Sequence, residues 1–376
     1  MVHFLHTADW QIGRQYGQLS PEDGAILAEA RFGAVQNIAS MAAGQSVDAV
    51  LVAGDVFDMQ DVSDRTIRRL FQLLEGFGGP WVLIAGNHDA ALGASVWTRA
   101  QALQCIPPNV HVLQSTRVLE LDDAGMAVLA APLTQRHTYD DVTAPFDTMA
   151  SAPGLIRVGL AHGSITGRLP DTIDSANPIA STRAQTARLD YLALGDWHGC
   201  LQIDERTWYA GTPEQDRFRA NEPGYVLSVR IESPGAAPDV ERVAVGQYRW
   251  HAWQERIAMD GDVEALSLRL EALGANDVLQ LVVEGSANGA AHAALETALG
   301  RAEARVRALR VEQGALVLEP DETDMAALGS SPWLIEVVSR LRTLQSDPEQ
   351  GDAAREALRL LVRLHGETLT SASEAS

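Results

Sequence analysis

The sequence predicts an α/β protein in which sheets are covered on both faces by helices. Over the first 230 residues, short apolar runs alternate with helical stretches. The runs are continuously apolar, which is typical of strands buried on both faces in layered α/β folds. Hydrophobic residues make up 46% of the 376-residue chain, enough for a large core.

The expected elements follow one another as such a fold requires. Ser20 and Pro21 offer an N-cap and a first-turn proline for a helix that continues to about Ala43. A second helix, rich in Arg, is expected from about Val62 to Gly76. Strands are expected over residues 2–9, 47–55 and 80–89, and in the segments VHVLQ, MAVLAAP, LIRVGLAHG and DYLALGDWHG.

Beyond residue 230 the pattern changes. The segment ESPGAAPD, residues 232–239, is typical of a turn or linker. Strands and helices then alternate in a shorter pattern, beginning with a strand in RVAVGQYRWHAW, and later helices could pack on their own domain or dock a partner. We expect a main domain over 1–235, a small α+β domain over 240–320, a helical segment over 330–368 and a disordered tail over 369–376.

Composition excludes several classes of protein. No apolar run approaches the roughly 20 residues that span a bilayer, so no membrane association is expected. The first residues lack the basic start and cleavage site of a signal peptide. Two cysteines, Cys105 and Cys200, exclude a disulfide framework and a Cys-based zinc finger, and they fit a reducing cytoplasm.

The charge is strongly acidic. The chain has 29 basic residues, all Arg, against 50 Asp and Glu, for a net charge of −21. Proteins that coat nucleic acid usually carry a basic surface. Any contact with DNA or RNA must therefore be local, assisted by metal ions or helped by a partner.

Polar residues gather where the apolar strands end, most of them beside a glycine. Such residues from neighbouring strands meet at one edge of an open α/β sheet. Taken singly, Asp9 could cap a helix, GNHD could be a turn and the histidines could lie in the core. Together they predict a site for divalent cations, formed by Asp9, Asp55, Asn87, His88, His162, Asp196 and His198.

The motifs HTADWQIG, GDVFD, GNHD, LAHG, LGDWHG and YAGTPEQDRF resemble those of the calcineurin-like metallophosphoesterases. Within that family they are most similar to the SbcD- and YhaO-type DNA repair nucleases. The resemblance covers about residues 3–230. It implies a layered metallophosphoesterase sandwich of two mixed sheets flanked by helices, followed by a small α+β capping domain and a helical C-terminal tail.

The resemblance also implies roles for individual residues. His88 would stand near the scissile phosphate, oriented by Asp58. One metal ion would be held by Asp9, Gln11, Asp55 and His198, and the other by Asp55, Asn87, His162 and Asp196, so that Asp55 bridges the two.

Two positions depart from the family pattern. Gln11 stands where the family has His, and Asp196 stands where it has the first His of Gly-His-x-His. Fewer nitrogen and more oxygen ligands favour two Mn²⁺ ions, with Mg²⁺ or Fe²⁺ as alternatives, over Zn²⁺. The weaker Gln11 ligand leaves open a first site that is weak or empty.

The expected activity is hydrolysis of a phosphodiester by a hydroxide that two metal ions activate. The resemblance implies a DNA exonuclease or endonuclease in repair, working with an SMC-like ATPase similar to SbcC, and it allows a homodimer. Arg14 and His137 could contact substrate phosphates or simply be solvated. The open alternatives are a phosphodiesterase or phosphatase for small molecules, and a weakly active subunit that organises the ATPase.

Overall fold

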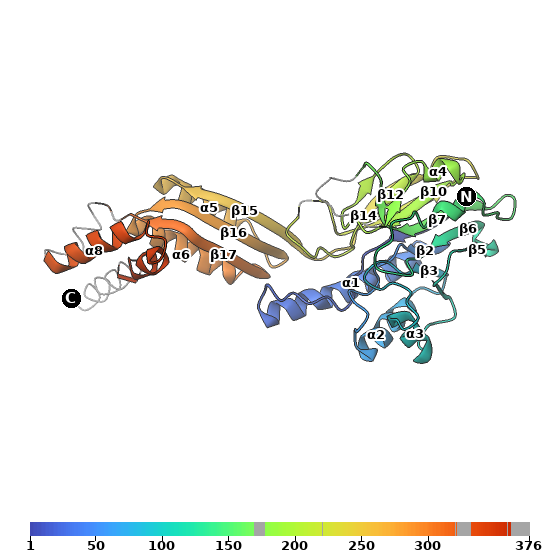
Figure 1. Ribbon diagram of the computed structural model, residues 1–376, viewed down its shortest axis with the longest axis horizontal. Helices are drawn as coiled ribbons and strands as arrows, with labels where there is room; N and C mark the ends of the chain where they lie inside the picture. The colour runs from blue at the N-terminus through green and yellow to red at the C-terminus, as the bar shows by residue number, and fades with distance from the viewer. Residues whose placement is uncertain (169–176, 220, 320, 322–331, 359, 362–376) are drawn as a thin grey trace. The chain divides into compact units, whose positions relative to one another are not determined.

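The computed structural model describes residues 1–168, 177–219, 221–319, 321, 332–358 and 360–361. These residues form two compact units, Met1–Tyr248 and Arg249–Ser376, each described here by itself (Figure 1). No helix in these ranges combines the length and the apolar character needed to cross a membrane.

The first unit is a sandwich of two six-stranded mixed sheets. In spatial order, the first sheet contains β14 (Asp239–Ala244), β13 (Tyr225–Ile231), β1 (Val2–Thr7), β2 (Ala49–Val52), β3 (Trp81–Ile84) and β4 (Val110–Leu113). The second contains β11 (Leu201–Gln202), β12 (Thr207–Tyr209), β10 (Tyr191–Gly195), β7 (Ile156–His162), β6 (Met126–Ala131) and β5 (Arg117–Leu121). The first sheet has parallel strands from β1 to β4 and two antiparallel strands at one edge, whereas the second has a parallel centre with an antiparallel strand at each edge.

Helices cover the outer faces of both sheets. Figure 1 shows α2 and α3 beside β2 and β3 of the first sheet. The covering elements of the first sheet are α1 (Pro21–Gly44), α2 (Asp64–Leu74) and α3 (Val96–Ala102). Those of the second are α4 (Arg183–Thr186) and the 3₁₀ turn η2 (Ala144–Asp147), and smaller elements are η1 (Asp122–Ala124), β8 (Ser164–Ile165) and β9 (Pro178–Ile179).

This arrangement explains the continuous apolar runs. In β2, Val50 and Val52 pack towards the helices, whereas Ala49 and Leu51 pack against the second sheet. Because alternate side chains point to opposite faces and both faces are buried, every position is apolar. The predicted sandwich of two mixed sheets flanked by helices is confirmed.

The first long helix begins where its signals predict. The Ser20 hydroxyl accepts a hydrogen bond from the Asp23 amide at 3.1 Å, and Pro21 occupies the first turn. These contacts satisfy one exposed donor of the helix start and fix its φ angle in advance. Residues 8–20, which include Asp9 and Gln11, connect β1 to this helix.

The second unit contains a parallel three-stranded sheet with two helices packed on it. Leu279 and Leu281 of the central strand pack with Leu266 and Leu295 of the helices. The elements are β15 (Arg249–Ile257), α5 (Asp260–Glu271), β16 (Asp277–Ala287), α6 (Gly289–Glu303), β17 (Ala308–Leu318) and α8 (Pro332–Leu344). The expected tail over 369–376 lies outside the described residues.

The junction was predicted in part. The segment 232–239, expected to be a turn or a linker, contains the turn of a hairpin, because β14 pairs antiparallel with β13 of the first sheet. The single strand expected in 242–253 is therefore two strands, and residues 240–248 belong to the first unit. A hairpin turn and a linker share the same Gly- and Pro-rich composition, so sequence alone did not separate them.

Candidate metal centre

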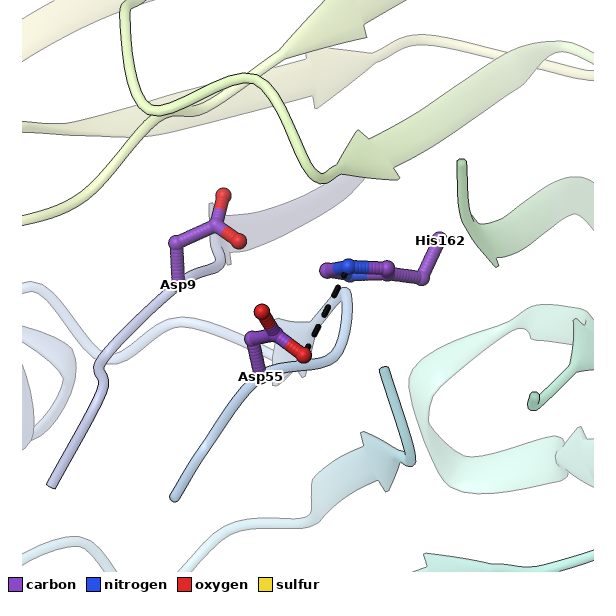
Figure 2. A group of neighbouring side chains, drawn as sticks. All are labelled: Asp9, Asp55 and His162. Atoms are coloured by element: carbon purple, nitrogen blue, oxygen red, sulfur yellow. Dashed lines mark ion pairs between the residues drawn. The ribbon is translucent and has the colours of Figure 1, made fainter. Parts of the chain in front are cut away.

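The polar residues predicted at the strand ends do come together. Asp9 follows β1, Asp55 follows β2 and His162 ends β7. Each offers a ligand atom, and these atoms all lie within 4.8 Å of one another. Figure 2 shows the three side chains around a common space, with His162 and Asp55 joined as an ion pair. Two sheets thus contribute to one cluster at the carboxyl ends of their parallel strands.

Asn87 and Asp196 extend this group around His162. The Nε2 atom of His162 lies 3.0 Å from Asn87 Oδ1, 3.6 Å from Asp55 Oδ1 and 3.8 Å from Asp196 Oδ1. On the other side of the ring, Nδ1 lies 2.8 Å from the Ala53 carbonyl oxygen. That bond orients the ring so that Nε2 faces the cluster, where it can bind a cation once its own proton is lost. We call Asp55, Asn87, His162 and Asp196 the His162 subsite.

The other predicted ligands have different neighbours. Gln11 Nε2 donates to Asp55 Oδ2 at 2.8 Å, and Gln11 Oε1 is buried without a hydrogen-bond partner. His198 Nδ1 lies 3.1 Å from Asp216 Oδ2, and the Arg217 guanidinium lies 3.0 Å from the same nitrogen. We call Asp9, Gln11, Asp55 and His198 the His198 subsite. Its side chains are engaged with one another or with groups outside the cluster.

The backbone at the cluster is held in an uncommon conformation. Positive φ angles occur at Asp9 (53°), Gln11 (48°), Asp55 (52°) and Asp196 (103°). Non-glycine residues rarely adopt such angles, and they persist only where surrounding contacts enforce them. Four of the predicted ligands are therefore aimed by strained turns that follow directly after strands.

Two motif glycines are required by this close approach. A Cβ atom on Gly54 would lie 2.5 Å from His162 Nδ1, and one on Gly86 would lie 2.1 Å from Asp55 Oδ1. Either contact is far shorter than van der Waals distance, so a larger residue would displace a predicted ligand. The Gly-Asp and Gly-Asn pairs of the sequence therefore have a geometric cause.

Buried carboxylates crowd one another in the cluster. Burial raises the pKa of Asp9 to about 6, and burial together with the Asp55 charge raises the pKa of Asp89 to about 7. Burial alone would lower the pKa of His162, but the charges of Asp55, Asp9 and Asp196 raise it to about 9. So much negative charge in a dry site calls for a positive counterion.

The donor set fits a divalent cation. It combines carboxylate oxygens, one oriented imidazole nitrogen and the unpartnered Gln11 Oε1. The end of the Asn87 side chain lies 3.0 Å from His162 Nε2 and 3.0 Å from Asp55 Oδ2, so its amide oxygen is near enough to share a cation with both. Oxygen-rich sets with imidazole suit Mn²⁺, Mg²⁺ or Fe²⁺.

His88 stands at the edge of the cluster, but its expected orienting contact is different. Its amide donates to Asp55 Oδ1 at 2.9 Å, and its Nδ1 lies 2.7 Å from the backbone oxygen of Asp58. The Asp58 carboxylate lies 3.2 Å from Arg14 instead. Asp58 thus contacts His88 as expected of an orienting residue, but through its backbone carbonyl rather than the expected carboxylate.

A groove of about 520 Å³ opens beside the cluster. Its walls combine polar groups with apolar ones such as Met59 and Leu92. Its lining includes Arg14, Asp58, Asn87, His88 and Arg136. His137 is exposed and does not line the groove, whereas its neighbour Arg136 does.

Sequence reasoning missed several buried polar residues around the cluster. Asp89 accepts hydrogen bonds from the amides of Gly86 (2.7 Å) and Phe57 (3.1 Å) and so joins two of the turns. Asp216 contacts His198, and Arg31 lies fully buried behind Asp9. The only indication of Asp89 and Asp216 in the sequence was their place inside the motifs GNHD and YAGTPEQDRF. Nothing in the sequence indicated Arg31, because it is one polar residue in a long helix.

Comparisons with known proteins agree with this geometry. The family model for calcineurin-like phosphoesterases matches residues 2–228. The SbcD component of the SbcCD nuclease of Rhodobacter capsulatus is 32% identical over 48% of this chain and 45% of its own length. The uncharacterized metallophosphoesterase YhaO of Bacillus subtilis is 26% identical over 52% of the chain and 48% of its own length.

A third relative is the DNA double-strand break repair protein Mre11 of Aeropyrum pernix, 26% identical over 66% of this chain and 63% of its own length. The chain thus spans between about half and two thirds of these curated relatives. The family model covers more than half of the chain. With the strand-end motifs and the sandwich of two mixed sheets, it leads to one conclusion: the chain belongs to the calcineurin-like phosphoesterase family.

Proposed function

We propose that this protein is a metal-dependent phosphodiesterase that cleaves DNA, as an exonuclease or endonuclease in DNA repair. The observation that carries the proposal is the buried convergence of Asp9, Asp55 and His162 at the strand ends of a calcineurin-like phosphoesterase domain. Relatives named as nuclease and double-strand break repair proteins favour DNA as the substrate.

The residues of the two subsites would hold two divalent cations, preferably Mn²⁺, with Mg²⁺ or Fe²⁺ as alternatives. Bound cations would lower the pKa of water and neutralise charge on the phosphate. We assign the tighter cation to the His162 subsite, because its ring is already oriented by Ala53. The His198 subsite must first release Gln11 from Asp55 and His198 from Asp216.

The chain itself supplies binding and proton transfer. His88 is fixed by Asp55 and the Asp58 carbonyl and lines the groove. It can therefore donate a proton or a hydrogen bond to an oxygen of a phosphodiester lying there. Arg14 and Arg136 line the same groove and would contact the flanking phosphates.

The acidic surface limits how DNA is held. With a net charge of −21, the chain has no excess positive charge to attract a nucleic acid over long distances. The local arginines and the bound cations would have to compensate. An SMC-like ATPase similar to SbcC, bound through the C-terminal helical segment in the cytoplasm, would supply further DNA contacts, and a homodimer would supply a second site.

Two alternatives each have an observation in their favour. The acidic charge also suits a phosphodiesterase or phosphatase that acts on small molecules. The bond between Gln11 and Asp55 and the engagement of His198 with Asp216 suit a weakly active subunit that organises the ATPase.

One assay separates the three functions. The metal-free protein is supplied with Mn²⁺, Mg²⁺ or Fe²⁺ and tested on single- and double-stranded DNA and on bis-p-nitrophenyl phosphate, with Asp55→Ala as the inactive control. We expect Mn²⁺-dependent cleavage of DNA. Turnover of the small diester without cleavage of DNA would favour the small-molecule enzyme, and no turnover with any metal would favour the organising subunit.

A further inference from the structure

Arg31 of α1 is a charged side chain that is only 1% exposed. Its guanidinium makes five hydrogen bonds, all to uncharged oxygen atoms. Nε donates to the Trp10 carbonyl at 2.6 Å, Nη1 to the Glu214 carbonyl at 3.1 Å and the Tyr16 hydroxyl at 3.2 Å, and Nη2 to the Thr212 hydroxyl at 2.8 Å and the Asp9 carbonyl at 3.1 Å.

These bonds use the full capacity of the side chain. A guanidinium has five N–H donors in a rigid plane, and all five are satisfied here. Burying a charge without such complete satisfaction is strongly unfavourable. Lysine, with three donors on a flexible stem, could not bridge the same acceptors. The position therefore requires arginine for its geometry as well as for its charge.

Two of the acceptors belong to the turn that carries predicted metal ligands. The carbonyls of Asp9 and Trp10 lie between the two positive φ angles, at Asp9 (53°) and Gln11 (48°). A backbone held at such angles needs external contacts to keep it there. The guanidinium provides such contacts through its bonds to the two carbonyls.

The segment that Arg31 binds on the other side, Thr212–Glu214, is itself held in place. The Glu214 carboxylate, also buried, accepts hydrogen bonds from the amides of Gln247 (2.7 Å) and Tyr248 (2.9 Å). Those two residues immediately precede Arg249, where the second unit begins. The segment Thr212–Glu214 thus gives Arg31 a rigid support, built from the late YAGTPE motif.

We propose that Arg31 is a positioning residue for the metal centre: it clamps the Asp9–Gln11 turn to the Thr212–Glu214 segment and so aims Asp9 and Gln11 at the cations. The proposal rests on the proposed function in one respect: its expected consequence, a change in metal affinity, requires that the cluster bind metal ions. It assigns no contact between Arg31 and a substrate or a metal ion.

The test compares Arg31→Lys with a control variant at another buried arginine. Arg183 is likewise buried, but it pairs with Asp141 (2.8 Å) and Asp147 (2.6 Å), which belong to neither subsite. We expect Arg31→Lys to weaken Mn²⁺ binding in calorimetry by about 10- to 100-fold, the usual effect of losing a supporting partner. Arg183→Met should lose thermal stability while its Mn²⁺ affinity stays within about twofold of wild type.

A second readout does not depend on metal. Hydrogen exchange of the metal-free protein should become faster at the amides of Asp9 and Gln11 in Arg31→Lys, and not in Arg183→Met. If Arg31→Lys does not fold, Thr212→Val removes a single acceptor with little change of shape and should give a smaller change in the same direction. Wild-type exchange and affinity in a folded Arg31 variant, or equal loss of affinity in the control, would overturn the proposal.

The two proposals fail differently. A wild-type protein that binds Mn²⁺ but hydrolyses no phosphodiester would overturn the proposed function and leave the Arg31 measurements valid. A wild-type protein that binds no Mn²⁺ would also overturn the proposed function, and hydrogen exchange would then decide alone whether Arg31 holds the turn.

Discussion

His162 and His198 both follow strands of the second sheet, but the groups that contact their rings differ. His162 is oriented by the Ala53 carbonyl, and its other ring nitrogen, Nε2, faces Asn87, Asp55 and Asp196. His198 contacts the carboxylate of Asp216 and the guanidinium of Arg217. One subsite is assembled in advance, whereas the other has its side chains satisfied by the protein itself.

The difference coincides with the two departures from the family pattern. Gln11 stands in place of an imidazole in the His198 subsite, and its amide nitrogen donates a hydrogen bond to Asp55. Asp196 replaces an imidazole in the His162 subsite and adds negative charge there. A neutral amide binds a cation weakly and a carboxylate binds it strongly, so we expect both changes to shift metal affinity from the His198 subsite to the His162 subsite.

The largest effect is expected at Asp55, the residue common to both subsites. Asp55→Asn should lower phosphodiester hydrolysis by roughly 10³-fold or more, because metal-ion stabilisation of charge is worth several kcal/mol. Calorimetry should show loss of Mn²⁺ binding at both subsites. The exposed Asp123→Asn is the control for removing one negative charge, and equal losses in the two variants would contradict a bridging role for Asp55.

Replacing His88 should lower turnover without changing the metal content of either subsite. We expect His88→Ala to reduce kcat by about 10²- to 10⁴-fold, as for a lost proton donor. Metal content measured by elemental analysis should stay at the wild-type level, because the imidazole of His88 belongs to neither subsite. If the variant lost metal together with activity, His88 would be a structural residue of the site.

Gln11→His should reduce the difference between the two subsites. An imidazole in place of the amide would free Asp55 Oδ2 from its hydrogen bond and restore a nitrogen ligand. We expect Mn²⁺ to bind the His198 subsite about tenfold more tightly in calorimetry, a gain of about 1.4 kcal/mol. Unchanged affinity would mean that Gln11 is not a ligand.

The smallest expected effect is the contribution of His6 to folding stability. It makes the protein less stable in acid and so limits the pH range in which the two subsites can be compared. His6 belongs to β1 and lies between the two sheets, 3.0 Å from the Tyr191 hydroxyl and 3.2 Å from the Leu194 carbonyl, and burial lowers its pKa to about 3. The unfolded chain, with a pKa near 6.5, therefore binds a proton that the folded chain does not. Stability is fully present above pH 6.5 and is lost as the pH falls towards 3.

Urea unfolding of the metal-free protein at pH 7, 6 and 5 measures this contribution. His6 should add a slope approaching about 1.4 kcal/mol per pH unit, and His6→Gln should remove it. The same slope in the variant would show that His6 is protonated in the folded protein.

The cluster could be predicted from the sequence because parallel strands end at a common edge. Asp9, Asp55 and His162 each follow a buried apolar strand, so their meeting needed only the sheet order. The direction of individual groups was harder to predict: the carbonyl of Asp58 contacts His88, whereas its carboxylate contacts Arg14.

Contacts that depend on packing between distant segments could not be predicted. Arg31 is one of many arginines in the chain, and only the folded structure shows its five acceptors. His198 and Asp216 are separated by strands β11 and β12, and their contact depends on where the later loop returns. The same holds for β14, whose partner strand was not itself predicted.

Anomalous diffraction at the manganese edge, from crystals grown in limiting Mn²⁺, measures the two subsites directly. We predict a strong peak among Asp55, Asn87, His162 and Asp196 and a weaker one among Asp9, Gln11, Asp55 and His198. Equal peaks, a stronger peak in the His198 subsite or no peak at either position would contradict the proposed difference between the subsites.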